Sequence, residues 1–231
     1  MATFVLIHGG GDSGWAWHLL AAELRSRGHE TVAPDLPSDQ PSAGLGDYAD
    51  AVVDAVVEAV GEPAEVRRDL VVVGHSYGAF TAPLVADRLP VGVLVLLAGM
   101  IPAPGERPDD WWETTGCNQA RDAAGLSAIE DPFESFYHDV PRALAEESMR
   151  REREESSRAG GEPWPLTAWP DAPTKFIVCK DDRFFPPEFF RGLARARLGI
   201  VPDEIGGGHC VALSRPEELA DLLEGYLRVQ F

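Results

Sequence analysis

Short apolar runs with the composition of β-strands alternate along this chain with segments of helical periodicity. Two of the runs, Thr3–His8 and Val91–Ala98, are almost entirely apolar, which is typical of strands buried on both faces of a sheet. This alternation predicts an α/β fold, in which helices cover both faces of a mostly parallel sheet. We expect six strands, at Thr3–His8, Glu30–Ala33, Leu70–Gly74, Val91–Ala98, Lys175–Cys179 and Ile200–Asp203.

Helical periodicity follows five of these strands and is interrupted after the fourth. Pro83 lies inside one helical segment, where it would remove a hydrogen bond, so we expect a kink there. The alternation stops between Ile101 and Pro173, a stretch that includes a charged run, Glu146–Arg158, whose Glu–Arg spacings of four residues predict an exposed helix. The expected helices are Trp15–Arg27, Asp47–Val60, Tyr77–Arg88, Pro187–Leu198 and Pro216–Val229.

An excess of acidic residues excludes several classes of partner. Asp and Glu number 38 against 20 Lys and Arg, which gives a formal net charge of -18 over 231 residues. Such a surface repels the phosphates of nucleic acids and the headgroups of anionic membranes. Three scattered cysteines suit neither a disulfide framework nor a zinc site, and the apolar run Thr3–Ile7 lacks the basic region of a signal peptide. We therefore expect a cytoplasmic protein without nucleic-acid or membrane partners.

The segment Gly74–Gly78 reads Gly-His-Ser-Tyr-Gly and matches the pattern G-x-S-x-G. It follows an apolar strand and precedes a helix that begins with small residues, which is the setting of a nucleophile elbow. The glycines are needed because the turn is too tight for side chains two positions either side of the serine. Ser76 is therefore the expected nucleophile. The alternative is a tight turn between a strand and a helix in another doubly wound fold.

A serine hydroxyl needs a base to accept its proton and a carboxylate to orient that base. In this architecture the three groups follow the chain in the order serine, acid, histidine, each after a strand. Of six histidines, only His209 lies between the last expected strand and the last expected helix. Asp181 and Asp182 both follow the strand Lys175–Cys179, and either could be the orienting acid. The other is expected to face solvent or cap the turn.

Acyl transfer also needs backbone N–H groups directed at the oxyanion that forms on the substrate. One donor is expected from Tyr77, the residue after the nucleophile. The other is expected from the glycine loop His8–Gly11, which follows the first strand and whose backbone can approach a substrate closely. A phosphate-binding loop is disfavoured, because the run matches neither G-x-x-x-x-G-K-[ST] nor G-x-G-x-x-G.

With these motifs the chain resembles the α/β-hydrolase superfamily over essentially its full length. The resemblance is strongest to the small members related to plant methylesterases and hydroxynitrile lyases. The segments that carry it are Val5–Gly9 with Gly14–Trp17, Gly74–Gly78, Asp182 with Pro186 four residues later, and Gly207–His209.

The resemblance implies roles and a division of the chain that the motifs alone leave open. It implies that Asp182 is the acid and that Gly10, two residues after the motif histidine, supplies the second oxyanion donor. It also implies a six-stranded hydrolase core made of residues 1–100 and 174–231, with a helical lid inserted at residues 101–173. The antiparallel strand pair that commonly begins this fold has no counterpart among the expected strands.

The expected function is hydrolysis of a small or medium apolar carboxylic ester or lactone, through an acyl-enzyme on Ser76. We expect no metal and no organic cofactor, and a monomer or homodimer that acts on a small molecule. The lid supplies the aromatic side chains that are expected to line an apolar substrate pocket, namely Trp111, Trp112, Phe133 and Phe136.

Two other functions remain open on the same fold. One is a non-catalytic protein that binds a small ligand. The other is a lyase or a carbon–carbon hydrolase that uses the same triad. Cyanohydrin cleavage is disfavoured, because hydroxynitrile lyases carry a threonine and a lysine at the positions that Gly9 and Cys210 occupy here.

Overall fold

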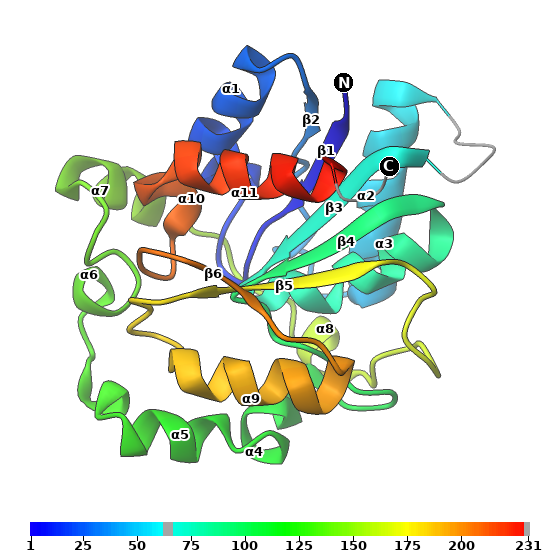
Figure 1. Ribbon diagram of the computed structural model, residues 1–231. Coiled ribbons are helices and arrows are strands. Elements are labelled where there is room, and N and C mark those ends of the chain that lie inside the picture. The colour runs from blue at the N-terminus through cyan, green and yellow to red at the C-terminus, as the bar shows by residue number, and fades with distance from the viewer. Residues whose placement is uncertain (62–66, 229–231) are drawn as a thin grey trace.

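The computed structural model describes residues 1–61 and 67–228 (Figure 1). Within them, six strands form one sheet in the order β2-β1-β3-β4-β5-β6, and every neighbouring pair is parallel. The expected α/β class with a parallel six-stranded sheet is confirmed. The strands are β1 (Thr3–Ile7), β2 (Glu30–Val32), β3 (Arg67–His75), β4 (Val91–Leu97), β5 (Thr174–Cys179) and β6 (Asp203–Ile205).

The last strand begins later than its apolar residues predict. The sequence predicts Ile200–Asp203, whereas β6 pairs with β5 only from Asp203 onward. Pro202 has no N–H to donate to a neighbouring strand, and the side chain of Val201 is 76% exposed. The apolar residues of this run therefore precede the strand, and the prediction of its bounds was wrong.

Helices cover both faces of the sheet, and the strand order explains their placement (Figure 1). The connection from β1 to β2 runs toward one edge, whereas those from β2 to β3 and from β3 to β4 run toward the other. Because such crossovers are right-handed, α1 lies on one face and α2 and α3 lie on the opposite face. The helices of the core are α1 (His18–Ser26), α2 (Leu45–Val60), α3 (Ala82–Arg88), α9 (Pro187–Leu198), α10 (Val211–Ser214) and α11 (Pro216–Arg228).

α11 packs against α1 and completes the layer on that face. Val229, the predicted end of this last helix, lies outside the described residues. Two short helices of the 3-10 type precede α1 and α3, namely η1 (Gly14–Trp17) and η2 (Ser76–Phe80).

Pro83 does not kink a helix, so that prediction was wrong. The predicted helix Tyr77–Arg88 is divided into η2 and α3, and α3 begins at Ala82. Pro83 therefore lies in the first turn of α3, where a backbone N–H would have no partner within the helix.

The chain between β4 and β5 consists of short helices. The charged run does not form one continuous helix. α7 ends at Arg150, and α8 begins only at Ser157. The predicted helix over this run is therefore corrected, although the expected Glu147–Arg151 ion pair forms at 2.6 Å. The elements here are η3 (Pro108–Asp110), α4 (Trp111–Thr114), α5 (Cys117–Ala123), η4 (Leu126–Ala128), α6 (Pro132–Ser135), α7 (Arg142–Arg150) and α8 (Ser157–Gly161).

The strand order places the functional segments next to one another. The chain leaves β1 toward β2 on one side, whereas β3 lies on the other side of β1. A crevice forms at the carboxyl ends of the strands where the order reverses in this way, and ligands bind there in open α/β sheets. The glycine loop after β1 and the serine after β3 both lie at this point.

Candidate active site

Ser76 occupies a strained turn directly after β3. Its φ angle is 51°, which lies in the left-handed region that residues other than glycine seldom adopt. The turn is closed by its glycines: a Cβ atom on Gly74 would lie 2.7 Å from the Ala82 side chain, and one on Gly78 would lie 2.5 Å from the carbonyl oxygen of His8. The N–H of Met100, which follows β4, donates to the Ser76 carbonyl at 3.0 Å.

The structure brings Asp182 and His209 together from the loops after β5 and β6. Asp182 Oδ2 lies 2.8 Å from His209 Nδ1, and both side chains are buried. The second oxygen, Oδ1, accepts hydrogen bonds from the N–H groups of Phe184 at 2.7 Å and Phe185 at 2.9 Å. These two donors fix the carboxylate, so that Oδ2 faces the imidazole. The pair then has the geometry with which a carboxylate orients a histidine for proton transfer.

Asp181 serves a different contact from its neighbour. Its Oδ2 accepts the N–H of Gly207 at 2.8 Å, and its own N–H donates to the Gly207 carbonyl at 3.0 Å. Asp181 is exposed to solvent, as expected for the aspartate that is not the acid. It also joins the loop after β5 to the loop that carries His209.

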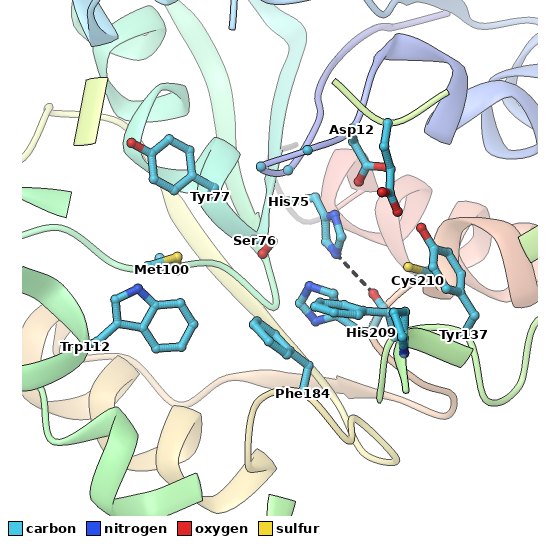
Figure 2. A pocket seen from close by; sticks show the side chains of 16 residues that line it. Asp12, His75, Ser76, Tyr77, Met100, Trp112, Tyr137, Phe184, His209 and Cys210 are labelled. Carbon is cyan, nitrogen blue, oxygen red and sulfur yellow. Dashed lines mark hydrogen bonds between the residues drawn. The ribbon is translucent and has the colours of Figure 1, made fainter. Parts of the chain in front are cut away.

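His75 contacts the backbone of His209. Its Nε2 lies 3.0 Å from the His209 carbonyl oxygen (Figure 2). A carbonyl can only accept, so Nε2 carries the proton and donates. Burial lowers the pKa of His75 well below its ordinary value, which keeps the ring neutral. In the sequence His75 is only the variable residue before the serine, and nothing there signals this contact.

The glycine loop after β1 is held by His8. The Leu36 N–H donates to His8 Nε2 at 3.0 Å, so Nδ1 carries the proton and donates to the Gly9 carbonyl at 2.9 Å. A Cβ atom on Gly10 would lie 3.4 Å from Tyr77 Cβ, so the two expected oxyanion donors are neighbours. Among the described residues, no hydrogen bond uses the Gly10 N–H. Tyr77 lies in the first turn of η2, where a backbone N–H has no partner within the helix.

A cavity of about 370 Å³ opens in front of Ser76 and His209 (Figure 2). Trp112 and Phe136, two of the four expected pocket residues, line it. Trp111 and Phe133 do not line it, which corrects the expectation for both. Trp111 is fully buried, and its indole N–H donates to the Ile101 carbonyl at 2.9 Å. The Phe133 ring instead packs under the guanidinium of Arg142, 3.3 Å from the ring centre.

The two ends of the cavity differ in polarity. Trp112, Phe184 and Met100 form an apolar wall on one side of the serine, whereas the carboxylate of Asp12 lies toward the other end (Figure 2). Glu152 also lines the cavity. Burial raises the pKa of Asp12 to about 7. Among the described residues that line the cavity, none is a lysine or arginine. Asp12 follows the glycine loop directly, and no motif in the sequence indicates a role for it.

Cys210 also lines the cavity, next to the expected base. Burial raises the pKa of its thiol well above the ordinary value, so the thiol stays protonated at neutral pH. Among residues 1–61 and 67–228, no group of three or more His, Cys, Asp and Glu side chains could hold a metal ion. No helix in the same ranges is long and apolar enough to cross a bilayer.

A serine in a strained strand–helix turn, followed along the chain by an aspartate and a histidine at later strand ends, defines the nucleophile-elbow class of α/β proteins. A model of the alpha/beta hydrolase family matches residues 4–222. The chain belongs to the alpha/beta hydrolase family.

Named relatives extend along almost the whole chain. It is 28% identical to "Probable esterase PIR7A" of Oryza sativa subsp. indica, over 95% of this chain and 94% of that protein. It is 24% identical to an alpha-hydroxynitrile lyase of Arabidopsis thaliana, over 95% of each chain. Its fold is similar to that of a pyrethroid hydrolase from Sphingobium faniae JZ-2, with a TM-score of 0.76, 23% identity, and coverage of 98% of this chain and 97% of that one.

Proposed function

We propose that this protein is a serine hydrolase that cleaves small or medium carboxylic esters or lactones. The observation that carries the proposal is the 2.8 Å contact between Asp182 and His209, because His209 lines the same cavity as the strained Ser76. Relatives named as esterases support it. The residues between β4 and β5 act in this proposal as a lid over the core formed by residues 1–100 and 174–231.

The first half of the proposed reaction forms an acyl-enzyme. Ser76 Oγ attacks the carbonyl carbon of the ester while His209 Nε2 accepts the hydroxyl proton, and Asp182 stabilises the imidazolium that results. The negative charge moves onto the carbonyl oxygen, where the N–H groups of Gly10 and Tyr77 donate to it. The tetrahedral intermediate then expels the alcohol, which takes the proton from His209.

The second half releases the acid. A water molecule enters, gives its proton to His209 and attacks the acyl-enzyme, and the same two N–H groups stabilise the second oxyanion. The bond to Ser76 Oγ then breaks, the serine recovers its proton from His209, and the carboxylic acid leaves. A lactone follows the same steps but yields a single hydroxy acid. No step needs a metal or an organic cofactor.

Every group in this scheme comes from one chain, so the proposed site is complete in a monomer and compatible with a homodimer. The cavity of about 370 Å³ lies in the range of small-molecule sites, and its wall of Trp112, Phe184 and Met100 suits an apolar substituent. On the sequence grounds given above, we propose the cytoplasm as the location.

A panel of p-nitrophenyl esters of increasing acyl length, assayed beside simple lactones, tests the proposed function. We expect turnover of at least one short or medium ester and labelling of Ser76 by a fluorophosphonate. A non-catalytic binding protein with an unactivated serine would show neither. A chain that cleaved a cyanohydrin or a carbon–carbon bond but no ester would contradict the proposal.

Trp112→Ala should change the preference for acyl length more than it changes the rate on the acetyl ester. Trp112 lines the cavity, so removal of its indole ring enlarges the cavity at the apolar wall. The triad lies on the core and should keep its geometry. We expect a shift toward longer acyl chains of roughly tenfold in relative kcat/KM.

Trp111→Ala is the matched control for this substitution. Trp111 is buried against the core and does not line the cavity, so its removal should lower stability by about 3–5 kcal/mol and leave the acyl preference unchanged. If Trp112→Ala lowered the rate on all esters by one common factor, the assignment of Trp112 to the pocket would be wrong.

The charge of the cavity should disfavour esters that carry a free carboxylate. We expect p-nitrophenyl pentanoate to be cleaved faster than p-nitrophenyl hydrogen glutarate, of matched length, by about tenfold at pH 8, since like charges within a few ångströms repel by about 1 kcal/mol or more. Asp12 is neutral below its pKa of about 7 and charged above it, so the preference should increase as the pH rises through 7.

Asp12→Asn should weaken this pH dependence, whereas Glu154→Gln, which removes an exposed carboxylate that does not line the cavity, should not. Ratios of kcat/KM for the two esters from pH 5.5 to 8.5 provide the measurement. A ratio that is the same in the wild type and in Asp12→Asn at every pH would contradict the role given to Asp12.

A further inference from the structure

The segment Arg153–Ser156 holds the glycine loop from the side opposite the core. The Arg153 N–H donates to the Gly11 carbonyl at 2.8 Å, and its guanidinium contacts Asp39 at 2.7 Å. Ser156 Oγ donates to the Ala43 carbonyl at 2.7 Å. This segment lies between α7 and α8, so the chain inserted after β4 is attached directly to the loop after β1.

Glu155 lies within this segment and directly beside the loop. Its Oε1 accepts the phenolic O–H of Tyr48 at 2.6 Å, and Tyr48 comes from the first turns of α2. Its Oε2 lies 3.6 Å from the position that a Cβ atom on Gly10 would occupy. Burial raises the pKa of the Glu155 carboxyl, while the hydrogen bonds from Tyr48 and from the Gly11 backbone act in the opposite direction.

Both neighbours of Gly10 in the glycine loop have polar backbone groups that are held by contacts. The Gly9 carbonyl accepts from His8 Nδ1, and the Gly11 carbonyl accepts from the Arg153 N–H. The Gly11 N–H faces the Glu155 carboxyl. Among the described residues, no hydrogen bond uses the Gly10 N–H in the middle of the loop, and this is the donor that the proposed reaction needs.

We infer that Glu155 is a positioning residue of the oxyanion loop: held by Tyr48, it fixes the peptide around Gly11 so that the Gly10 N–H points at the substrate oxyanion. The inference rests on the proposed function. Glu155 does not line the cavity, so it touches neither the substrate nor the reacting atoms. It therefore acts only through the loop.

The size of the effect follows from what the loop must do. Removal of one oxyanion donor outright costs on the order of 10²–10³ in kcat. Loss of Glu155 leaves the Gly10 N–H in place but releases one of the contacts that orient it, so a smaller loss is expected. The donor matters for the tetrahedral species and not for the bound ester, so kcat should fall while KM stays nearly constant.

The test compares Glu155→Ala with Glu155→Gln and with Glu154→Ala, an exposed neighbour on the same segment. We expect Glu155→Ala to lower kcat by roughly 10- to 100-fold with KM changed less than about twofold. Glu155→Gln can present its amide oxygen to the Gly11 N–H and donate its amide N–H to the Tyr48 oxygen, so it should retain most of the rate. Glu154→Ala should match the wild type.

A pair of inhibitors separates positioning from packing. A trifluoromethyl ketone adds to Ser76 Oγ and places an oxyanion between the two donors, whereas the matching methyl ketone fills the cavity without forming that adduct. For Glu155→Ala we expect the affinity for the first to fall in parallel with kcat and the affinity for the second to stay constant. Equal losses for both ketones, or a kcat within twofold of the wild type, would overturn the inference.

Tyr48→Phe provides a second variant if Glu155→Ala does not fold. It keeps the ring packed and removes only the O–H that holds the carboxylate, and we expect kcat to fall by about three- to tenfold with the same pattern toward the two ketones. An unchanged kcat and unchanged ketone affinities in Tyr48→Phe would also count against the inference. Absence of any ester turnover in the wild type would overturn the proposed function itself.

Discussion

Ser76→Ala should lower ester hydrolysis by roughly 10⁴–10⁶-fold and abolish labelling by a fluorophosphonate, as removal of a triad member does in well-studied serine hydrolases. The hydroxyl is the group that forms the covalent bond in the proposed reaction, and no other side chain in the cavity can replace it. The Cys210 thiol lines the same cavity, but burial raises its pKa far above neutrality, so it supplies no thiolate.

The fold of Ser76→Ala should be retained, because alanine keeps the Cβ atom and places no new group in the turn. Ser26→Ala, at an exposed serine near the end of α1, is a matched control that should keep both activity and labelling. Initial rates on the best p-nitrophenyl ester, with circular dichroism spectra of both variants, provide the measurement. Activity at even a tenth of the wild-type rate in Ser76→Ala would show that the nucleophile lies elsewhere.

The sequence predicts the centre of the sheet well because burial there imposes composition. Every residue of β1 and β4 is buried, so nearly every position is apolar, and the pattern can be recognised in the sequence of each strand by itself. At the edge of the sheet this constraint weakens. Among the described strands, β6 pairs with β5 alone, and its start is decided by the missing N–H of Pro202, which a count of apolar residues does not register.

The bounds of the helices are also difficult to predict from the local sequence alone. Pro83 is compatible with two structures, a kinked long helix or a new helix that begins one residue earlier, and the tight turn at Ser76 decides for the second. The i,i+4 spacings of the charged run stabilise a helix by only a few tenths of a kcal/mol each. The hydrogen bonds of Arg153 and Ser156 to distant backbone carbonyls occur where the helix is broken.

In the active site, the sequence predicts catalytic residues from their order along the chain, but it does not predict contacts between residues far apart in the chain. The expected serine, acid and histidine each follow a strand, so counting strands selects Ser76, His209 and the pair Asp181 and Asp182, and the family resemblance then favours Asp182. The contacts of His75 and Glu155 join residues 134 and 107 positions apart, and no spacing rule predicts them.

Two adjacent tryptophans show why pocket residues are the hardest to assign. Trp111 and Trp112 are identical in type and lie next to each other in α4, where one residue turns the chain by about 100°. Trp111 therefore faces the core and Trp112 the cavity. The sequence cannot distinguish them, because the helix is a single turn with no periodic pattern.

The two neighbouring aspartates offer the most selective test of the proposed triad. Both carboxylates accept a hydrogen bond from a loop element, but the partners differ in kind: Asp182 reaches the imidazole of His209 at 2.8 Å, whereas Asp181 reaches the backbone N–H of Gly207 at 2.8 Å. An amide at position 182 can still accept from the N–H groups of Phe184 and Phe185, so the loop should keep its shape.

Asp182→Asn should therefore fold normally but lower kcat by roughly 10⁴-fold, because an amide that donates toward Nδ1 favours the wrong histidine tautomer and stabilises no imidazolium. Asp181→Asn should cost less than about tenfold, since its amide oxygen can still accept the Gly207 N–H and no charge is needed there. Measurement of kcat for both variants on one ester decides between them. A large loss in Asp181→Asn with a mild one in Asp182→Asn would place the orienting acid one residue earlier, and the hydrogen bond between Asp182 and His209 would then be structural.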